Sequence, residues 1–340
     1  MATLKDIAEK CNVSVAAVSL VLNDKPNRIS ETVKKDIIAT AKELNYQPNQ
    51  VARSLSKGKS NIIGLIIPDI RNNHFANILA EIEELLTPSG YNIMVGNSND
   101  EAQSDLSFLR SFVSYNVDGL IVVTASNHTE ATLKEIDQIL IDSKIPIVFL
   151  DRDPNIKNYS SFTTNNRLGG YLATKHLISL GHKRIGCLTG PLKSKSAYGR
   201  YQGFLDALKE FDLFETSNIY FEGDYKIESG IASFPYFLRF NATAIFSSND
   251  IMAIGLNHAA QSHNLTIPKD LSIVGFDDID LAKLMYPTLT TVSQPVSKII
   301  KNGCQTLLYK IRNKSHVAET KIYDPELIIR DSTYPPKKLE

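Results

Sequence analysis

Aspartate, asparagine and arginine residues follow several short apolar runs of this 340-residue chain, and they are the residues best placed to bind a ligand. These polar positions are Asp69 to Asn73, Asp151-Arg152, Asn165-Asn166, Asn249-Asp250 and Asp277-Asp278. Carboxylates accept hydrogen bonds, whereas amide and guanidinium groups present fixed forks of donors, so together they suit a ligand rich in hydroxyl groups. Aspartate and asparagine are also ordinary turn residues, so the prediction depends on several such positions converging.

The spacing of apolar segments predicts the elements that would position these residues. Apolar runs of strand length lie at 62–67, 91–95, 119–123, 145–150, 184–188, 244–246 and 272–276. Amphipathic helical patterns lie between them, among others at 75–86, 106–115, 168–180 and 198–211. This alternation predicts an α/β fold of parallel sheets covered on both faces, in which ligands bind at the carboxyl ends of the strands. The series breaks near residues 153–158, which predicts two lobes.

Composition excludes several classes of protein. The three cysteines, Cys11, Cys187 and Cys304, are odd in number and far apart, so neither a disulfide scaffold nor a metal site is expected. The seven histidines form no metal-binding pattern, and neither a Gly-rich phosphate loop nor a G-x-S-x-G elbow is present, so we expect no enzyme and no cofactor. The sequence shows no signal-peptide pattern and no apolar segment of membrane-spanning length, which predicts a cytoplasmic protein.

The first 60 residues predict a small helical module. Thr3 is placed to cap a helix over 4–10, Ser14 a second one to about residue 22, and Ser30 a third. Two helices of about two turns each cannot bury enough surface alone, so the third is needed to complete a core. Residues 1–60 carry ten basic and six acidic side chains, a net charge of +4, which leaves −4 for the rest because the whole chain is neutral. This asymmetry suits phosphate contact at one end only.

The head contains four phrases that belong together: Thr3-Leu4-Lys5-Asp6-Ile7-Ala8, Val13-Ser14, Val18-Ser19 and Val21-Leu22-Asn23. In these phrases the head resembles the LacI/GalR family almost position for position. The resemblance implies a helix-turn-helix whose second helix enters the major groove of a palindromic operator. The DNA-contacting residues of the head would be Thr3, Ser14, Val15, Ala16, Ala17, Ser19, Leu20 and Asn23. Since the outward positions are poor in hydrogen-bonding groups, we expect thymine-methyl contacts and groove shape to matter more than bidentate readout.

The connector at 49–60 is helix-compatible for only about two turns and then polar. It resembles the family's hinge helix, which orders on operator DNA and places a leucine in the minor groove. Leu55 matches that leucine, and Asn49, Ala52 and Arg53 are the accompanying DNA-contacting residues.

The body resembles the family's effector domain and its periplasmic sugar-binding relatives over residues 61–330. Supporting phrases include Gly169-Gly170-Tyr171, Thr189-Gly190-Pro191-Leu192 and Gly275-Phe276-Asp277-Asp278. The ligand positions of the ribose-binding branch, together with a possible ring-covering tyrosine, map to Asn73, Phe75, Asp151, Arg152, Arg200, Tyr225, Asn249, Asp277 and Gln294. The segment 193–198 departs from every branch, which leaves the exact ligand open.

These observations predict three parts: a head at 1–48, a hinge helix and linker at 49–60, and a two-lobed effector-binding and dimerisation domain at 61–340. One lobe is expected at about 61–159 and 291–320, the other at about 160–290 and 321–332. The predicted function is a homodimeric transcriptional repressor controlled by a small sugar, ribose or a related pentose. Two alternatives stay open: a catabolite-control-type regulator whose main effector is a phosphocarrier protein, and a purine- or nucleoside-responsive repressor. A free sugar-transport protein does not fit, because a DNA-binding head stands where its signal peptide would be.

Overall fold

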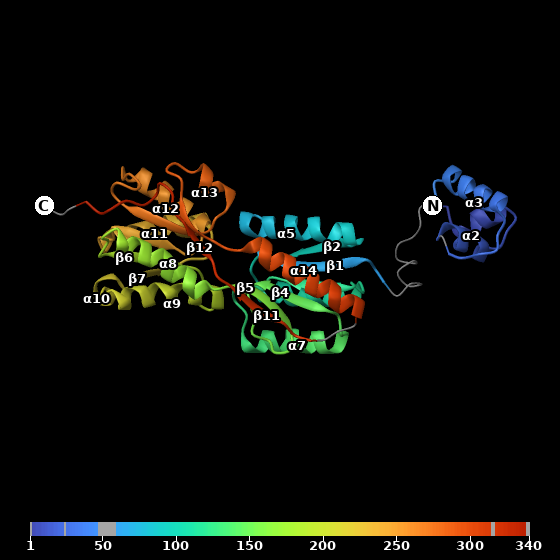
Figure 1. Cartoon of the computed structure of the whole chain (residues 1–340), viewed down its shortest axis with the longest axis horizontal. Helices are drawn as coiled ribbons and strands as arrows, with labels where there is room; N and C mark the ends of the chain where they lie inside the picture. The colour runs from blue at the N-terminus through green and yellow to red at the C-terminus, as the bar shows by residue number, and fades with distance from the viewer. Residues whose placement is uncertain (1, 24, 47–58, 314–316, 338–340) are drawn as a thin grey trace. The chain divides into compact units, whose positions relative to one another are not determined.

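The computed structural model of the protein describes residues 2–23, 25–46, 59–313 and 317–337. The chain separates into two units, residues 1–60 and residues 61–340 (Figure 1). The predicted hinge helix, with Asn49, Ala52, Arg53 and Leu55, lies outside the described residues.

The first unit contains three helices, α1 (Leu4–Lys10), α2 (Val15–Leu22) and α3 (Glu31–Glu43). Each begins where the sequence predicts, because Thr3, Ser14 and Ser30 accept a hydrogen bond from the backbone of the first turn. Apolar side chains from all three helices form its core: Ile7, Ala8, Val18, Ile37 and Ala41.

The second unit is built on two sheets, one in each lobe. The sheet of lobe 1 has the order β11-β5-β4-β3-β1-β2 and is parallel throughout. Its strands are β1 (Ile62–Ile67), β2 (Asn92–Asn97), β3 (Gly119–Val122), β4 (Ile147–Asp151), β5 (Ser160–Thr164) and β11 (Thr320–Tyr323). Two helices pack on each face: α5 (Asn73–Leu86) with α14 (Val296–Asn313), and α6 (Ala102–Ser114) with α7 (Glu130–Ser143). A short 3₁₀ turn, η1 (Thr87–Ser89), follows α5.

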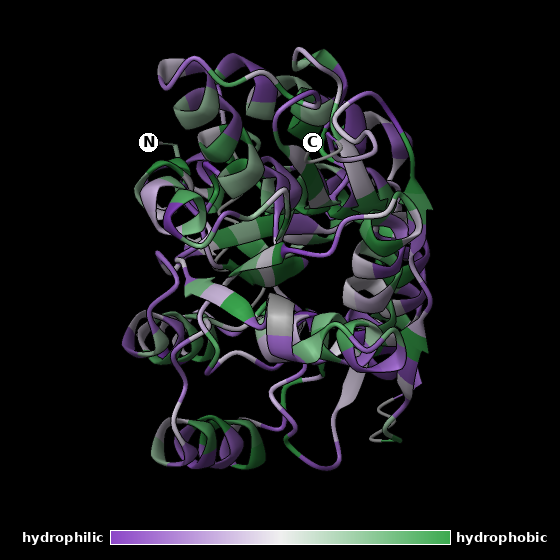
Figure 2. Ribbon diagram, turned by 90° about the vertical axis from the view of Figure 1, so that its left-hand side faces the viewer, coloured by the Kyte–Doolittle hydropathy of each residue, from purple (hydrophilic) through white to green (hydrophobic). Residues whose placement is uncertain are grey.

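The sheet of lobe 2 has the order β12-β10-β9-β8-β6-β7, and only β12 runs antiparallel to its neighbour. Its strands are β6 (Ile185–Thr189), β7 (Ile219–Glu222), β8 (Ala244–Ser247), β9 (Ser272–Asp277), β10 (Thr290–Ser293) and β12 (Glu326–Ile328). Its helices are α8 (Asn166–Ser179), α9 (Lys195–Glu210), α10 (Phe214–Ser217), α11 (Ile227–Arg239), α12 (Asp250–Ser262) and α13 (Asp280–Leu284). Figure 2 shows the green, apolar colouring on strands in the interior of the body.

The chain crosses between the lobes after β5, after β10 and after β11. These crossings correct the expected lobe boundaries, because β5 and β11 belong to lobe 1 and β10 belongs to lobe 2. The correction has a physical reason: β5 reads Ser-Ser-Phe-Thr-Thr, so its sequence lacks the apolar run by which buried strands are recognised, although all five residues are buried.

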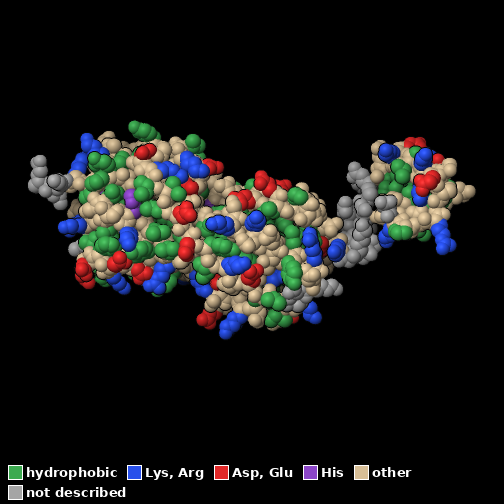
Figure 3. Space-filling view, viewed as in Figure 1, with side chains coloured by type: hydrophobic (Ala, Val, Ile, Leu, Met, Phe, Trp, Pro, Cys, Tyr) green, Lys and Arg blue, Asp and Glu red, His purple; other side chains and the backbone are tan. Residues whose placement is uncertain are grey.

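The surface of the body carries both signs of charge, interspersed over the face shown in Figure 3. Among the described residues, no helix is long and apolar enough to cross a membrane.

Candidate effector cleft and DNA-binding head

The carboxyl ends of both sheets face a cleft between the lobes, and most of the predicted ligand residues meet there in one small cavity. Its lining comes from lobe 1 (Asn72, His74, Phe75, Asp151, Arg152) and from lobe 2 (Ser196, Arg200, Tyr225, Asn249, Asp277). The free volume is about 20 Å³, room for about one water molecule. We call this space the effector cavity.

On the lobe 1 side, Asp151 is held by a buried histidine. His74 Nε2 donates to Asp151 Oδ1 over 2.9 Å, and both side chains are buried. Burial by itself raises the pKa of Asp151, but His74, Arg152 and Arg200 outweigh that effect and lower the pKa to about 2. Asp151 also has a φ of 63°, a left-handed conformation that aspartate tolerates better than bulky residues. The carboxylate is therefore ionised and fixed in position.

Arg152, the next residue, lies close to two aromatic rings, one from each lobe. Its guanidinium carbon is 5.3 Å from the ring centre of Phe75 in lobe 1 and 5.5 Å from that of Tyr225 in lobe 2. Its Nη1 donates to Asp100 Oδ1 over 2.6 Å and to the carbonyl of Thr124 over 3.0 Å. These contacts bring a buried cation to two rings that could cover the faces of a ligand.

On the lobe 2 side, Arg200 and Asp277 form the matching charged pair. Arg200 Nη1 lies 3.6 Å from Asp277 Oδ1, and the guanidinium carbon lies 3.6 Å from the ring centre of Phe276. Close packing of α8 on α9 places this arginine, because a Cβ on Gly170 would lie 2.0 Å from the carbonyl oxygen of Arg200. Asp277 has a φ of 113°, an uncommon backbone conformation of the kind that gathers at functional sites.

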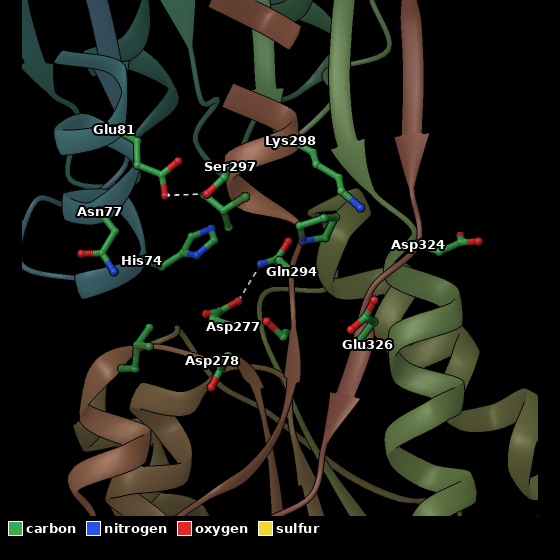
Figure 4. Close-up of a pocket in the computed structure, with 14 residues that line it drawn as sticks. His74, Asn77, Glu81, Asp277, Asp278, Gln294, Ser297, Lys298, Asp324 and Glu326 are labelled. Atoms are coloured by element: carbon green, nitrogen blue, oxygen red, sulfur yellow. Dashed lines mark hydrogen bonds between the residues drawn. The ribbon is translucent and has the colours of Figure 1, made fainter. Parts of the chain in front are cut away.

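Gln294 links this pair to the crossings between the lobes. Its Nε2 donates to Asp277 Oδ1 over 2.7 Å, and its Oε1 accepts from Thr164 Oγ1 over 2.6 Å. Thr164 ends β5, and Gln294 directly follows β10, so one side chain connects two of the three crossings to the cleft. Gln294 lines a neighbouring space of about 390 Å³ together with His74, Asp277 and Glu81 (Figure 4).

Three predicted ligand residues have a different setting from the one expected. One of them, Gln294, lines the neighbouring space and not the effector cavity. Asn73 does not line the effector cavity; Asn72 does, and its side chain caps α5 by accepting from the backbone of His74. Asn249 lines the cavity, but its Oδ1 caps α12 at Met252 and its Nδ2 donates to the carbonyl of Tyr225. His74 and Ser196 were not predicted. The available signal for His74 was its position directly after the polar residues Asp69 to Asn73, which follow β1.

In the head, the predicted contact residues lie along one surface of α2. Val15 is 44% exposed and Ala16 is exposed, whereas Val18 on the opposite side is fully buried. Ala17, Ser19, Leu20 and Asn23 are partly exposed. The hydroxyl of Ser14 accepts from the backbone of Ala17, and the amide of Asn23 donates to the carbonyl of Ser19. Thr3 forms a reciprocal capping pair with Asp6 at the start of α1.

Comparison with known proteins identifies the family. The family model for bacterial regulatory proteins of the lacI family matches residues 3–49, and that for a periplasmic binding protein-like domain matches residues 174–333. The HTH-type transcriptional repressor PurR of Aliivibrio salmonicida is 35% identical over 338 residues, covering 98% of this chain and 99% of the relative. The ribose operon repressor of Haemophilus influenzae is 33% identical over 336 residues, with the same coverage.

Solved structures give the same result. A LacI family regulator of Enterococcus faecium with bound ribose is 28% identical, with a TM-score of 0.74 over 81% of this chain and 99% of that chain. The lac repressor dimer bound to operator and an anti-inducer is 26% identical, with a TM-score of 0.84 over 98% and 99%. The chain therefore belongs to the LacI family, as its head predicts. It is a DNA-binding transcriptional regulator with a ligand-binding domain, and it is not an enzyme.

Proposed function

We propose that this protein is a repressor whose affinity for operator DNA is set by a small sugar, ribose or a related pentose. The observation that carries the proposal is the effector cavity, where ionised groups and two aromatic rings from both lobes converge. Asp151 and Asp277 would accept hydrogen bonds from vicinal hydroxyls, while Phe75 and Tyr225 would cover the apolar faces of the ring. The ribose held by the Enterococcus faecium relative supports this choice of ligand.

Ligand binding at this site is coupled to movement of the lobes. A space of about 20 Å³ cannot admit a pentose unless the lobes open and the side chains rearrange. A ligand shifts such an equilibrium by its difference in affinity for the two states, and DNA shifts ligand affinity by the same factor in return. We propose that the pentose acts as an inducer and lowers operator affinity by roughly one to two decades.

The repressor would act in the cytoplasm as a homodimer on a palindromic operator. A recognition helix with so few hydrogen-bonding side chains gains specificity by reading two half-sites. The operator-bound dimer of the lac repressor supports this assembly. Sedimentation at micromolar concentration should give the mass of two chains, and a stable mass of one or of four chains would contradict the proposal.

A purine is the second candidate effector. The rings of Phe75 and Tyr225, which both line the effector cavity, could also cover a flat base, and the PurR relatives favour testing this. Titration calorimetry with ribose, arabinose, xylose, hypoxanthine and guanine would separate the two classes. Binding of a pentose alone supports the proposal. Binding of a purine alone overturns the sugar assignment. Binding of none of the five overturns both assignments and favours a protein effector such as a phosphocarrier protein.

A further inference from the structure

The guanidinium of Arg152 is held by a residue outside the lining of the effector cavity. Its Nη1 donates to Asp100 Oδ1 over 2.6 Å, and Asp100 belongs to the loop between β2 and α6. Burial by itself lowers the pKa of Arg152, and nearby acidic groups, Asp100 foremost, outweigh that effect and raise it. Asp100 is therefore the principal counter-charge of this arginine, ahead of Asp151.

The same carboxylate ties a second loop to the first. Asp100 Oδ1 accepts from the backbone N–H of Ser126 over 3.0 Å, and Asp100 Oδ2 accepts from the Ser126 hydroxyl. Ser126 belongs to the loop between β3 and α7, whose Thr124 carbonyl is the other acceptor of Arg152 Nη1, at 3.0 Å. Asp100 therefore fixes both acceptors of this Nη1 group, one directly and one through the loop.

The backbone at Asp100 has an uncommon conformation. Asn99 and Asp100 both have a left-handed φ, of 54° and 61°, and the N–H of Asp100 donates to the carbonyl of Pro68 over 2.8 Å. Asparagine and aspartate tolerate this conformation better than most residues, and glycine adopts it freely. Replacing Asp100 by glycine therefore removes the carboxylate without straining the chain.

Asn127 joins the same two loops at a different point. Its Oδ1 accepts from the backbone N–H of Ala102 over 2.8 Å, and its Nδ2 donates to Glu101 Oε2 over 2.7 Å. Both bonds link the loops without contacting the arginine. They provide the comparison that a test of Asp100 needs.

The partners that hold the guanidinium by hydrogen bonds all belong to lobe 1. Asp277 differs, because its partner Gln294 directly follows β10 at a crossing between the lobes. The orientation of Arg152 therefore does not depend on closure of lobe 2. A side chain that is already ordered loses less conformational entropy when a ligand binds, which favours affinity.

We infer that Asp100 is a positioning residue, which holds Arg152 in its ligand-binding orientation before lobe 2 closes over the ligand. This inference rests on the proposed function, in which Arg152 binds the hydroxyl groups of a pentose. Asp100 acts only through the arginine. Its removal should therefore weaken ligand binding and release the guanidinium together.

Titration calorimetry with ribose on the full-length protein gives the first test. We expect ribose to bind Asp100→Gly roughly tenfold or more weakly than wild type, because Arg152 loses its charged partner. Asp100→Asn should recover most of the affinity, since an amide oxygen can still accept from Arg152 and Ser126. The matched control is Asn127→Ala, which removes two hydrogen bonds between the same loops and should stay within about threefold of wild type.

Nuclear magnetic resonance of protein containing isotope-labelled arginine gives a second test that needs no ligand. A guanidinium held by fixed acceptors rotates slowly and shows separate Nη signals, which are assigned by their loss in Arg152→Lys. These signals should remain separate in wild type and in Asn127→Ala. They should merge in Asp100→Gly.

The outcomes separate this inference from the proposed function. If Asp100→Gly binds ribose like wild type, or if Asn127→Ala loses as much affinity, the positioning role is wrong and the pentose proposal stands. If ribose does not bind the wild type, the pentose proposal fails and the Nη signals decide on Asp100. Separate Nη signals in Asp100→Gly overturn the positioning role in either case, and merged signals support it.

Discussion

The DNA-binding head and the effector cleft are built in opposite ways. The head takes its core from residues within about 40 positions of one another, and its helices start at caps that belong to the same turn. The cleft joins residues from Asn72 to Gln294, contributed by both lobes and by the crossings between them. Local chemistry therefore specifies the head, whereas the cleft depends on the closure of a whole domain. A substitution in the head should therefore leave ligand binding unchanged, and a substitution in the cleft should leave operator binding without ligand unchanged.

The largest effect is expected in the cleft, from Arg152→Ala or Asp277→Ala. Each change would leave hydroxyl groups of the pentose without their partner in the closed effector cavity, which both side chains line. Removing one partner of such a pair costs about 2 to 5 kcal/mol, which corresponds to roughly two to four decades of pentose affinity. Calorimetry measures this loss, and operator affinity without ligand should stay within about twofold of wild type.

A matched control for these variants is Asp280→Ala. Asp280, in the first turn of α13, forms an ion pair with exposed Lys283 of the same helix, so its removal should cost less than about 1 kcal/mol. If both Arg152→Ala and Asp277→Ala keep the pentose affinity of the wild type, the effector cavity is not the pentose-binding site.

A smaller effect is expected in the head from Ala16→Asp. Ala16 is exposed in the first turn of α2, where a carboxylate stabilises the helix but repels DNA phosphates. Operator affinity should fall by roughly one decade or more at fixed salt, while the thermal stability of the protein does not fall. Ala16→Ser is the uncharged control. An Ala16→Asp protein that binds operator like wild type would show that this surface of α2 does not face DNA.

The smallest effect is the pH dependence of the cleft. Burial lowers the pKa of His74, but the carboxylates of Asp277 and Asp151 outweigh burial and raise the pKa above its usual 6.5. A raised folded-state pKa stabilises the fold below pH 6.5, and the contribution is lost as pH rises through the folded value. The difference in unfolding free energy between wild type and His74→Gln should therefore be larger at pH 6 than at pH 9.

Its size should be roughly 1 to 3 kcal/mol at low pH, as for hydrogen bonds to charged groups. Chemical denaturation of both proteins at each pH measures it, and the comparison cancels the titration of Asp250, whose pKa burial raises. A difference that is constant across pH would mean that His74 stays neutral in the folded protein.

The same contrast explains what the sequence could predict. The starts of α1, α2 and α3 follow from Thr3, Ser14 and Ser30, because capping needs only the next three residues. The assignment of β5 could not be made this way. Its hydroxyl-bearing side chains are buried because the sheet and the crossing place them inside. Hydrogen bonds such as that from Thr164 to Gln294 compensate for the cost of burying these hydroxyl groups.

In the cleft, residue types were predicted better than residue positions. The strand-end rule placed Asp151, Arg152 and Asp277 at the cavity, since it follows from parallel-sheet geometry. It could not distinguish Asn72 from Asn73, because that choice depends on where α5 begins and how its first turn is oriented.

The central claim is that a pentose in the cleft controls the head, and an operator titration with and without ligand tests it most directly. Fluorescence anisotropy would follow binding to a selected palindromic operator at one fixed salt concentration, because phosphate contacts make affinity steeply salt-dependent. The account predicts that ribose weakens operator binding by roughly one to two decades, and that Asp277→Ala abolishes the response. Tighter binding with the ligand would reverse the proposed switch, and unchanged operator affinity with a pentose shown to bind would contradict the coupling itself.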